Sequence, residues 1–456
     1  MNGSSIIKKS SSLITSQLIK MILQLVSIPI LARYVSVQDF GVFAIISSYI
    51  GFFQKIKDGG LSLAALQAPS ISLNQEKALN TLNVLLGVVF FLISVVLCDY
   101  FISFYKLTID KYLIFIILLS ILISSLSIQG DAKLRRNLNF IYLAKADIFI
   151  YVISISISII MAILDYGILA LLSVTFIQPI LKFITVISKF RIGFNFKFKE
   201  IYGFVKFGFT LLAKEILVYI DNFSYSLILG VGAGSKDLIG KLNRSNSLGN
   251  IFFANIIPRI IDVMRPYYSI SKEKKNVVSD DFWLLIISLI SVSFVFFSEI
   301  LANIILGPNW SEVGVFIKFL VIGFAFDSLI ELSQVHDFVD KNGRKIFLIK
   351  SFDTIFITFS LILSYYFTNI YIYLFSFPIL KFIKFFLQIF CYGKRLKTFK
   401  YRTILIVILL VFTPFLSYLI HSLIFSIFIS IVTYFSIIIL FKNEIRNTLQ
   451  SFRRFR

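Results

Sequence analysis

Cysteine and histidine are nearly absent from this sequence of 456 residues. The two cysteines, Cys98 and Cys391, lie inside apolar stretches and are too few for a disulfide framework. The two histidines, His336 and His421, stand far apart, and no cysteine or carboxylate cluster accompanies them at a metal-ligand spacing. We therefore expect no metal site and no cofactor.

Charged residues are also scarce. They make up 15% of the chain, against about 25% in ordinary soluble proteins. Hydrophobic residues make up 58%, and the mean hydropathy is +0.89. A soluble protein would have no surface on which to place so much Phe, Ile and Leu, whereas lipid accepts them. Because the apolar runs are continuous over about 18–25 residues and do not alternate, they predict membrane-spanning helices and not a β-barrel.

The apolar runs predict an all-α polytopic membrane protein with about fourteen transmembrane helices. Lys20 interrupts the first run and no small-residue cleavage site follows it, so we interpret this run as a span and not as a cleaved signal. A count of twelve, in which neighbouring runs merge, is the alternative. The second and eighth spans are the least apolar of the set, which covers 11–33, 38–56, 79–101, 111–130, 140–164, 167–189, 203–229, 240–264, 281–306, 313–335, 346–368, 370–392, 402–420 and 422–441.

The charges that remain are distributed unevenly between the two sides of these spans. The side that holds both termini has 35 Lys or Arg, counting the ends of the adjoining spans, and the opposite side has six. The positive-inside rule therefore predicts that both termini are cytoplasmic. The net charge of +21 is thus explained by membrane orientation, and we expect no nucleic-acid partner.

A short internal repeat accompanies the spans. The turn after the first span leads to Gly41, and the turn after the seventh leads to Gly240, each at the start of a weakly apolar helix. The two turns are six spans apart, an even number, so both copies have the same orientation. This predicts a parallel repeat about an axis along the membrane normal.

Polar side chains form stripes along several otherwise apolar spans, and such stripes in a membrane are candidates for function. The basic stripes favour a water-filled cavity inside the membrane. Snorkelling to the interface and buried ion pairing are the alternatives. The candidates for the lining of this cavity are Lys20, Lys182, Lys214, Gln17, Gln24 and Gln178.

Four carboxylates inside spans are candidates for ion coupling: Asp221, Asp327, Glu331 and Asp353. A buried carboxylate can take up a proton or a sodium ion. Asp221 shares a helix face with Lys214, two turns earlier, so a bound anion would compete with it for that lysine. The alternative is that the four carboxylates pair with lysines and bind no ion.

Three stretches resemble the family of Wzx-type polysaccharide flippases, which transport O-antigen and exopolysaccharide precursors. They are Leu31–Gly41 (LARYVSVQDFG), Gly51–Leu61 with its Asp-Gly-Gly-Leu end, and Lys206–Asn222 with Lys-Phe-Gly at its start and Ile-Asp-Asn at its end. The sequence departs from the family pattern at Lys241, because Ile239-Gly240-Lys241-Leu242 replaces an aliphatic residue followed by Gly-Leu-Tyr. The chemistry at this position therefore differs from the family pattern.

The resemblance implies the fold of the multidrug and toxin extrusion transporters, with two six-helix lobes around a central cavity. The lobes would be residues 1–200 and 201–400, and residues 401–456 would add two peripheral helices and a basic cytoplasmic tail. The implied function is to move an undecaprenyl-pyrophosphate-linked oligosaccharide across the inner membrane. The residues expected to bind its head group are then Lys20, Lys182, Lys214, Gln17, Gln24 and Gln178. The implied partners are this lipid-linked oligosaccharide, membrane lipids, and a polysaccharide polymerase with its chain-length machinery.

Two other functions compete with this interpretation. A polytopic glycosyltransferase or polysaccharide polymerase generally has a long outer loop with catalytic residues, and the longest outer loops here have about nine residues. A drug or cation exporter of the same fold would have acidic residues deep in its cavity, whereas the deep stripes here are basic. We therefore expect a transporter and not an enzyme.

Overall fold

The structure, a computed structural model, describes residues 3–68, 70–190, 193–231, 235–258, 280–339 and 343–392. The chain divides into two compact units, Met1–Asn243 and Arg244–Arg456. We call these the first and second units. The lobe boundaries expected at residues 200 and 400 stay predictions.

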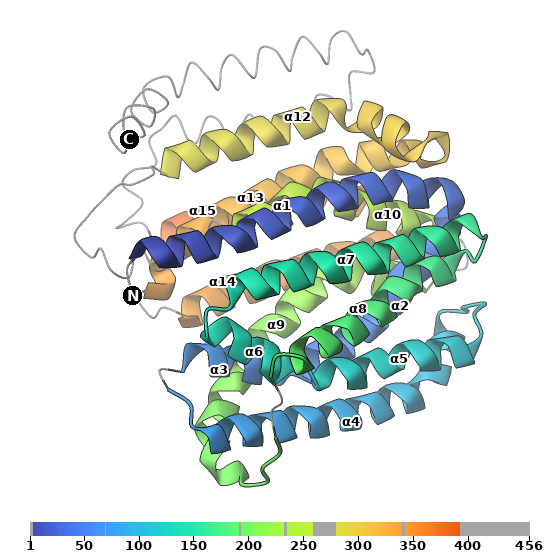
Figure 1. Ribbon diagram of the computed structural model, residues 1–456. Helices are drawn as coiled ribbons and strands as arrows, with labels where there is room; N and C mark the ends of the chain where they lie inside the picture. Colours follow the sequence, from blue (N-terminus) through green and yellow to red (C-terminus); the bar gives the residue numbers. More distant parts are fainter. Residues whose placement is uncertain are drawn as a thin grey trace. The chain divides into compact units, whose positions relative to one another are not determined.

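The first unit contains a bundle of long helices connected by short turns (Figure 1). Within it α1 packs on α7, α7 on α8, α4 on α5, and α2 on α9. α10 begins in this unit and ends in the second. The helices are α1 (Gly3–Tyr34), α2 (Val37–Ile56), α3 (Leu61–Gln67), α4 (Leu73–Phe104), α5 (Lys111–Ser125), α6 (Ile128–Arg136), α7 (Phe140–Ile163), α8 (Ile168–Ile187), η1 (Phe198–Ile201), α9 (Tyr202–Leu229) and α10 (Ser235–Gly249).

The second unit is built on α13, which packs against α12 and α15, while α14 packs against α15. Its helices are α12 (Asp280–Leu306), η2 (Pro308–Trp310), α13 (Ser311–Val339), α14 (Gly343–Tyr366) and α15 (Tyr371–Tyr392).

The first twelve expected spans each contain a helix of the structure. The fourth is interrupted between α5 and α6, and the eighth corresponds to α10 and helical residues 251–258. The two expected C-terminal spans and the basic tail lie outside the described residues. Nine segments of the described chain are long and apolar enough to cross a membrane, so this is a multi-pass membrane protein.

Three of the expected spans, α2, α9 and α10, are not among those nine segments. The reason is their polarity. A helix that is covered by other helices can be more polar, because it does not need a continuous apolar surface toward lipid. In α2, which packs against α4, α5, α8 and α9, Phe40, Ile45 and Ile46 are fully buried. On α4, by contrast, Leu92 and Val96 are more than half exposed, as residues that face lipid would be.

The glycines of the expected repeat mark a close contact between α2 and the start of α10. A Cβ on Gly41 would collide with the carbonyl oxygen of Lys236, and a Cβ on Gly240 would collide with that of Val37. Each carbonyl belongs to the residue four positions before the opposite glycine. The same contact is therefore made twice, once in each direction, as a two-fold relationship between the two helix starts requires. This supports the parallel repeat.

Candidate functional site: a charged cavity within the first unit

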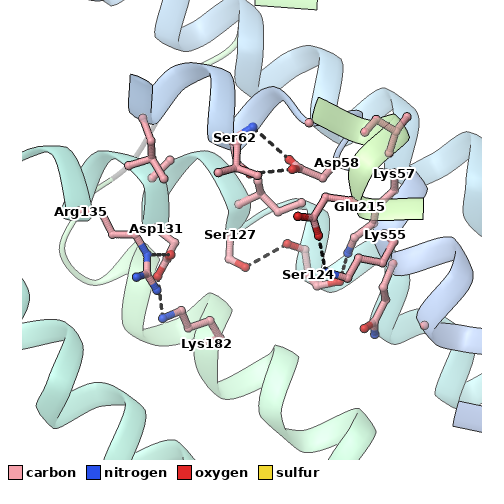
Figure 2. A pocket seen from close by; sticks show the side chains of 18 of the residues that line it. Lys55, Lys57, Asp58, Ser62, Ser124, Ser127, Asp131, Arg135, Lys182 and Glu215 are labelled. Atoms are coloured by element: carbon pink, nitrogen blue, oxygen red, sulfur yellow. Dashed lines mark hydrogen bonds and ion pairs between the residues drawn. The ribbon is translucent and has the colours of Figure 1, made fainter. Parts of the chain in front are cut away.

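A cavity of about 590 Å³ lies among helices of the first unit (Figure 2). We call it the charged cavity. Residues from α2, α3, α5, α6, α8, α9 and the adjoining turns line it: Gly51, Gln54, Lys55, Lys57, Asp58, Gly60, Ser62, Leu63, Leu66, Ser124, Ser127, Ile128, Asp131, Ala132, Arg135, Lys182, Leu212, Glu215 and Phe223.

The lining is unusually rich in charge for a membrane protein. Four cations and three carboxylates contribute to it, although the surrounding helices are apolar. Charged groups inside membrane proteins are costly, and they usually face a water-filled path or a ligand site. The cations are Lys55, Lys57, Arg135 and Lys182, and the carboxylates are Asp58, Asp131 and Glu215.

A chain of ion pairs connects the cavity wall to α1. The Lys182 ammonium lies 2.7 Å from an Asp131 carboxylate oxygen and 3.1 Å from one of Asp147. The Arg135 guanidinium donates to Asp131 over 2.7 Å, and the Lys20 ammonium lies 3.8 Å from Asp147. These five residues come from α1, α6, α7 and α8. The lysine at the centre is therefore shared by two carboxylates from neighbouring helices.

The position of Lys182 follows from the sequence around it. Pro179 lies inside α8 one turn earlier and has no N–H to donate to the carbonyl of Thr175. Gln178 beside it donates to the Ser154 hydroxyl of α7 over 3.2 Å. Small serine side chains let membrane helices approach closely, so α7 and α8 hold their charged residues within ion-pair distance.

Lys57 and Asp58 enter the cavity from the turn between α2 and α3, outside the helical segments. The Lys57 ammonium donates to the Ile121 carbonyl over 2.9 Å and to the Ser124 hydroxyl. Lys57 is only 3% exposed, and this burial lowers its pKa to about 7, against the opposing effect of Asp58. Burial also raises the pKa of Asp58, although hydrogen bonds from Ser62 and Asn83 oppose the shift.

The shape of this turn depends on two glycines. Gly59 and Gly60 have φ values of 58° and 70°, in the left-handed region that favours glycine. A Cβ on Gly60 would collide with the carbonyl oxygen of Gly208 in α9, and a Cβ on Gly208 would meet that of Gly59. The turn and α9 therefore touch backbone to backbone. All three glycines belong to stretches that carried the family resemblance.

The structure brings together only part of the predicted head-group set. Lys182 lines the cavity, and Lys20 joins it through Asp147. Gln17 and Gln24 are half-buried on α1 and do not belong to the cavity lining. The side chain of Lys214 lies outside the described residues. The head-group assignment as a whole stays a prediction.

Sequence reasoning missed most of the cavity lining. Lys55, Lys57 and Arg135 were counted as cytoplasmic loop charges, and Asp131 and Glu215 were not singled out. A signal was present for Lys55 and Lys57, because both precede the Asp-Gly-Gly-Leu motif within the second resemblance stretch. Charge inside a motif of tight backbone contacts indicates a site more strongly than charge in an ordinary loop.

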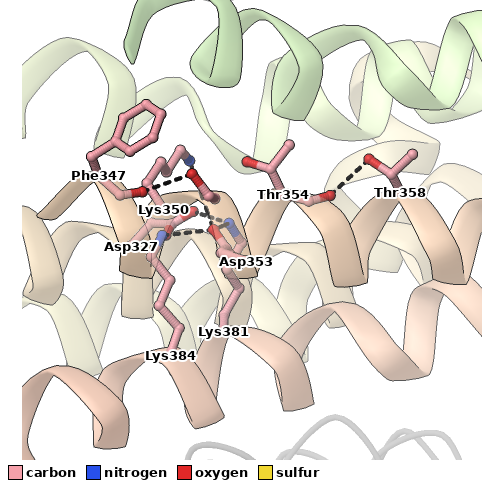
Figure 3. A network of polar contacts seen from close by, with 9 residues as sticks. Asp327, Phe347, Lys350, Asp353, Thr354, Thr358, Lys381 and Lys384 are labelled. Atoms are coloured by element: carbon pink, nitrogen blue, oxygen red, sulfur yellow. Dashed lines mark hydrogen bonds and ion pairs between the residues drawn. The ribbon is translucent and has the colours of Figure 1, made fainter. Parts of the chain in front are cut away.

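The second unit contains its own buried ion cluster (Figure 3). The Lys381 ammonium of α15 lies 2.7 Å from Asp327 of α13 and 2.8 Å from Asp353 of α14. The Lys384 ammonium makes the same two contacts at 2.6 and 2.7 Å, and Lys350 lies 3.7 Å from Asp353. We call these five residues the α13–α15 cluster. Two of the four candidate coupling carboxylates are therefore paired with lysines.

Lys381 and Lys384 were missed because they were counted with the cytoplasmic end of their span. A repeat in the sequence marks Lys381: residues 179–184 and 378–383 are both Pro-Ile-Leu-Lys-Phe-Ile. Lys182 and Lys381 are 199 positions apart, as are Gly41 and Gly240.

The other two candidates for ion coupling, Asp221 and Glu331, do not belong to the α13–α15 cluster. Asp221 is half-buried on α9 and Glu331 is exposed on α13, and ion coupling stays a prediction for all four.

Comparison with known proteins gives a family match. The family described as polysaccharide biosynthesis protein matches residues 30–315, a range that includes all three motifs. A membrane protein of the cps region of Klebsiella pneumoniae is 26% identical over 65% of this chain and 61% of its own length. The teichuronic acid biosynthesis protein TuaB of Bacillus subtilis is 24% identical over 57% and 56%, and the succinoglycan biosynthesis transport protein ExoT of Rhizobium meliloti is 23% identical over 54% and 50%. The chain thus spans half to about three fifths of the length of these relatives.

Two solved structures share the fold. The lipid II flippase MurJ in an inward closed conformation has a TM-score of 0.73 at 18% identity and covers 94% of this chain and 99% of its own. An inward-facing multidrug resistance transporter of the MATE family has a TM-score of 0.56 at 12% identity, covering 88% and 97%. At these identities the likeness concerns the fold alone.

Proposed function

Because this chain belongs to the polysaccharide biosynthesis protein family, we propose that it is a flippase for a lipid-linked oligosaccharide. The substrate would be an undecaprenyl-pyrophosphate-linked repeat unit of an O-antigen, capsule or exopolysaccharide, moved across the bacterial inner membrane. Both termini would be cytoplasmic, and a polysaccharide polymerase with its chain-length machinery would act on the product.

One observation supports this proposal above the others: a cavity with four cations lies among membrane helices. A pyrophosphate can enter such a place only if cations replace its hydration. The names of the relatives agree, since TuaB is a teichuronic acid biosynthesis protein and ExoT a succinoglycan transport protein. MurJ, which shares the fold, is a lipid II flippase.

The ion pairs suggest how the cavity would accept and release an anion. Asp131 holds both Lys182 and Arg135. A phosphate that reaches these two side chains competes with Asp131 for them, and Lys182 can stay balanced by Asp147 during the exchange. The carboxylate thus occupies the cations while the cavity is empty, and the cost of leaving them without a partner is avoided.

The competing functions fit the cavity less well. A drug exporter needs carboxylates that can meet a lipophilic cation, but Asp131 and Glu215 are paired with cavity cations, and Asp58 accepts from Ser62 and Asn83. ExoT is named a transport protein and MurJ a flippase, and these names support our proposal of transport without catalysis.

The test is transport by purified protein in vesicles that contain a lipid-linked oligosaccharide. A membrane-impermeant oxidant reports how much of the oligosaccharide has reached the outer leaflet. Lys182→Gln should slow flipping at least tenfold. Because the single variant leaves buried carboxylates less well balanced, the charge-balanced Lys182→Gln/Asp147→Asn variant should also be made. It should fold normally and remain inactive.

The matched control is Lys133→Gln/Glu76→Gln, which removes a partly buried ion pair outside the cavity lining. It should flip at the normal rate. Normal flipping by the charge-balanced Lys182 variant would disprove the assignment of the cavity. No flipping by the unmodified protein with any lipid-linked oligosaccharide would disprove the function itself.

A further inference from the structure

Lys57 differs from the other three cations of the charged cavity in its partners. Lys55 is 2.8 Å from Glu215, and Lys182 and Arg135 share Asp131. Lys57, by contrast, forms no ion pair with a carboxylate among the residues that the structure describes. Its ammonium instead donates to the Ile121 carbonyl and the Ser124 hydroxyl of α5.

The geometry leaves Lys57 able to accept a ligand. A lysine ammonium has three N–H donors, and the carbonyl and the hydroxyl occupy two of them. The side chain is only 3% exposed and belongs to the cavity lining. A phosphate oxygen that takes the third donor would meet a cation that forms no ion pair with a carboxylate, so no carboxylate would have to be displaced.

We propose that Lys57 anchors the phosphate of the substrate in the charged cavity, and that each anion bound there is accompanied by one proton taken up by the Lys57 amine. This inference rests on the proposed function, which supplies the phosphate. The reactants are a neutral amine, the anion and one proton, which the acid form of the buffer gives up as it becomes its conjugate base. The product is an ammonium–phosphate pair. No bond to carbon or phosphorus changes.

The charges around Lys57 favour this proton uptake. Lys55 on α2 is balanced by Glu215 on α9, while Arg135 on α6 and Lys182 on α8 face Asp131. Asp58, the remaining carboxylate, lies in the same turn as Lys57. With Lys57 neutral, the lining has three cations and three carboxylates, so an anion that entered without a proton would leave an uncompensated negative charge.

Burial supports the same direction. Since the pKa of Lys57 in the empty cavity is about 7, the amine is mostly neutral above that pH. A bound phosphate stabilises the charged form and raises this pKa. By linkage, anion affinity should fall about tenfold for each pH unit above 7, until the raised pKa of the bound state is reached.

Calorimetry of the purified full-length protein in nanodiscs tests this inference. Inorganic pyrophosphate and farnesyl pyrophosphate are titrated at pH 8.5 in two buffers with different ionisation enthalpies, which gives the number of protons taken up per anion. We expect about one more proton for the unmodified protein than for Lys57→Arg. The ionisation of the probe itself is the same in both titrations and cancels.

Two further variants complete the experiment. Arginine is larger than lysine and could disturb the cavity, so Lys57→Met is a second variant without a titratable amine. It should lose the proton uptake and bind the probes at least tenfold more weakly at pH 6.5. Lys133→Arg, outside the cavity lining, should take up the same number of protons as the unmodified protein. Preference for farnesyl pyrophosphate identifies a lipid-linked head group as the ligand, and equal binding of both probes identifies free pyrophosphate chemistry.

The outcomes separate the two proposals. Binding with equal proton uptake in the unmodified protein, Lys57→Arg and Lys57→Met would overturn the role of Lys57 and leave the proposed function standing. Failure of the unmodified protein to bind either probe between pH 6.5 and 8.5 would overturn both the anionic site and the inference built on it.

Discussion

Lys182 and Lys381 occupy the same position in two identical six-residue stretches, and each of them bridges two aspartates from two other helices. Lys182 joins Asp131 and Asp147, and Lys381 joins Asp327 and Asp353. In both cases a proline lies three residues earlier in the same helix. The internal repeat therefore extends from the backbone to the buried charges, and the two clusters can be tested with the same kind of substitution.

The α13–α15 cluster should be important for stability. Lys381→Met removes one of the two lysines that contact both Asp327 and Asp353. Lys384 still contacts both aspartates in this variant, but each aspartate loses a buried contact with a cation, and a hydrogen bond to a charged group is worth about 1.5–3 kcal/mol. We expect a clear fall in the Tm of detergent-purified protein, measured by thermal unfolding with size-exclusion readout.

Lys350→Met is the control within the same cluster, because its 3.7 Å contact with Asp353 is the longest of the set. It should lower the Tm much less. Equal effects of the Lys350 and Lys381 single variants would contradict the structure of this cluster.

The contact between α2 and α10 should not tolerate a methyl group. In Gly41→Ala or Gly240→Ala the new Cβ would overlap a carbonyl oxygen of the opposite helix. Overpacking of this kind costs about 1–3 kcal/mol, so both variants should accumulate poorly in the membrane. Gly203→Ala on α9 has open space around the new Cβ and should accumulate normally. Similar levels for all three variants would show that the helices are farther apart than described.

The topology is open to direct measurement. The charge bias predicts that Arg456 is cytoplasmic and that the turn at Asn309 is on the outer side. A reporter that is active only in the cytoplasm should therefore give a signal when fused after Arg456 and none when inserted at Asn309. The same signal at both positions would rule out the fourteen-span arrangement.

Coupling to an ion gradient can be tested at Asp221. The spacing of Lys214 and Asp221 places them on one face of α9, about 10 Å apart along its axis, so a bound anion and Asp221 would compete for the lysine. Asp221→Asn should weaken the dependence of flipping on an imposed proton or sodium gradient in vesicles. Intact flipping with unchanged gradient dependence would exclude Asp221 as the coupling residue.

Hydropathy was enough to predict the fold class, because a run of Leu, Ile and Phe long enough to cross a bilayer has few alternatives to a helix. It also identified Lys182, since a lysine in the middle of such a run is costly wherever the helix lies. Its partners Asp131 and Asp147 could not be assigned, because helix rotation and packing decide which charges meet. Lys57 was missed for another reason. It lies in a turn, where sequence alone does not distinguish a solvated charge from one folded back into the protein.

The backbone contact between Gly60 and Gly208 has a mechanical consequence for the cavity. It leaves no side chain between α9 and the turn that holds Lys57, so no compressible layer can absorb a displacement of one against the other. A tilt of α9 would therefore move the turn that holds Lys57. This movement would change the distances from the Lys57 ammonium to the Ile121 carbonyl and the Ser124 hydroxyl. If Lys57 binds the anion as proposed, three glycines that do not touch the ligand would couple anion affinity to the position of α9.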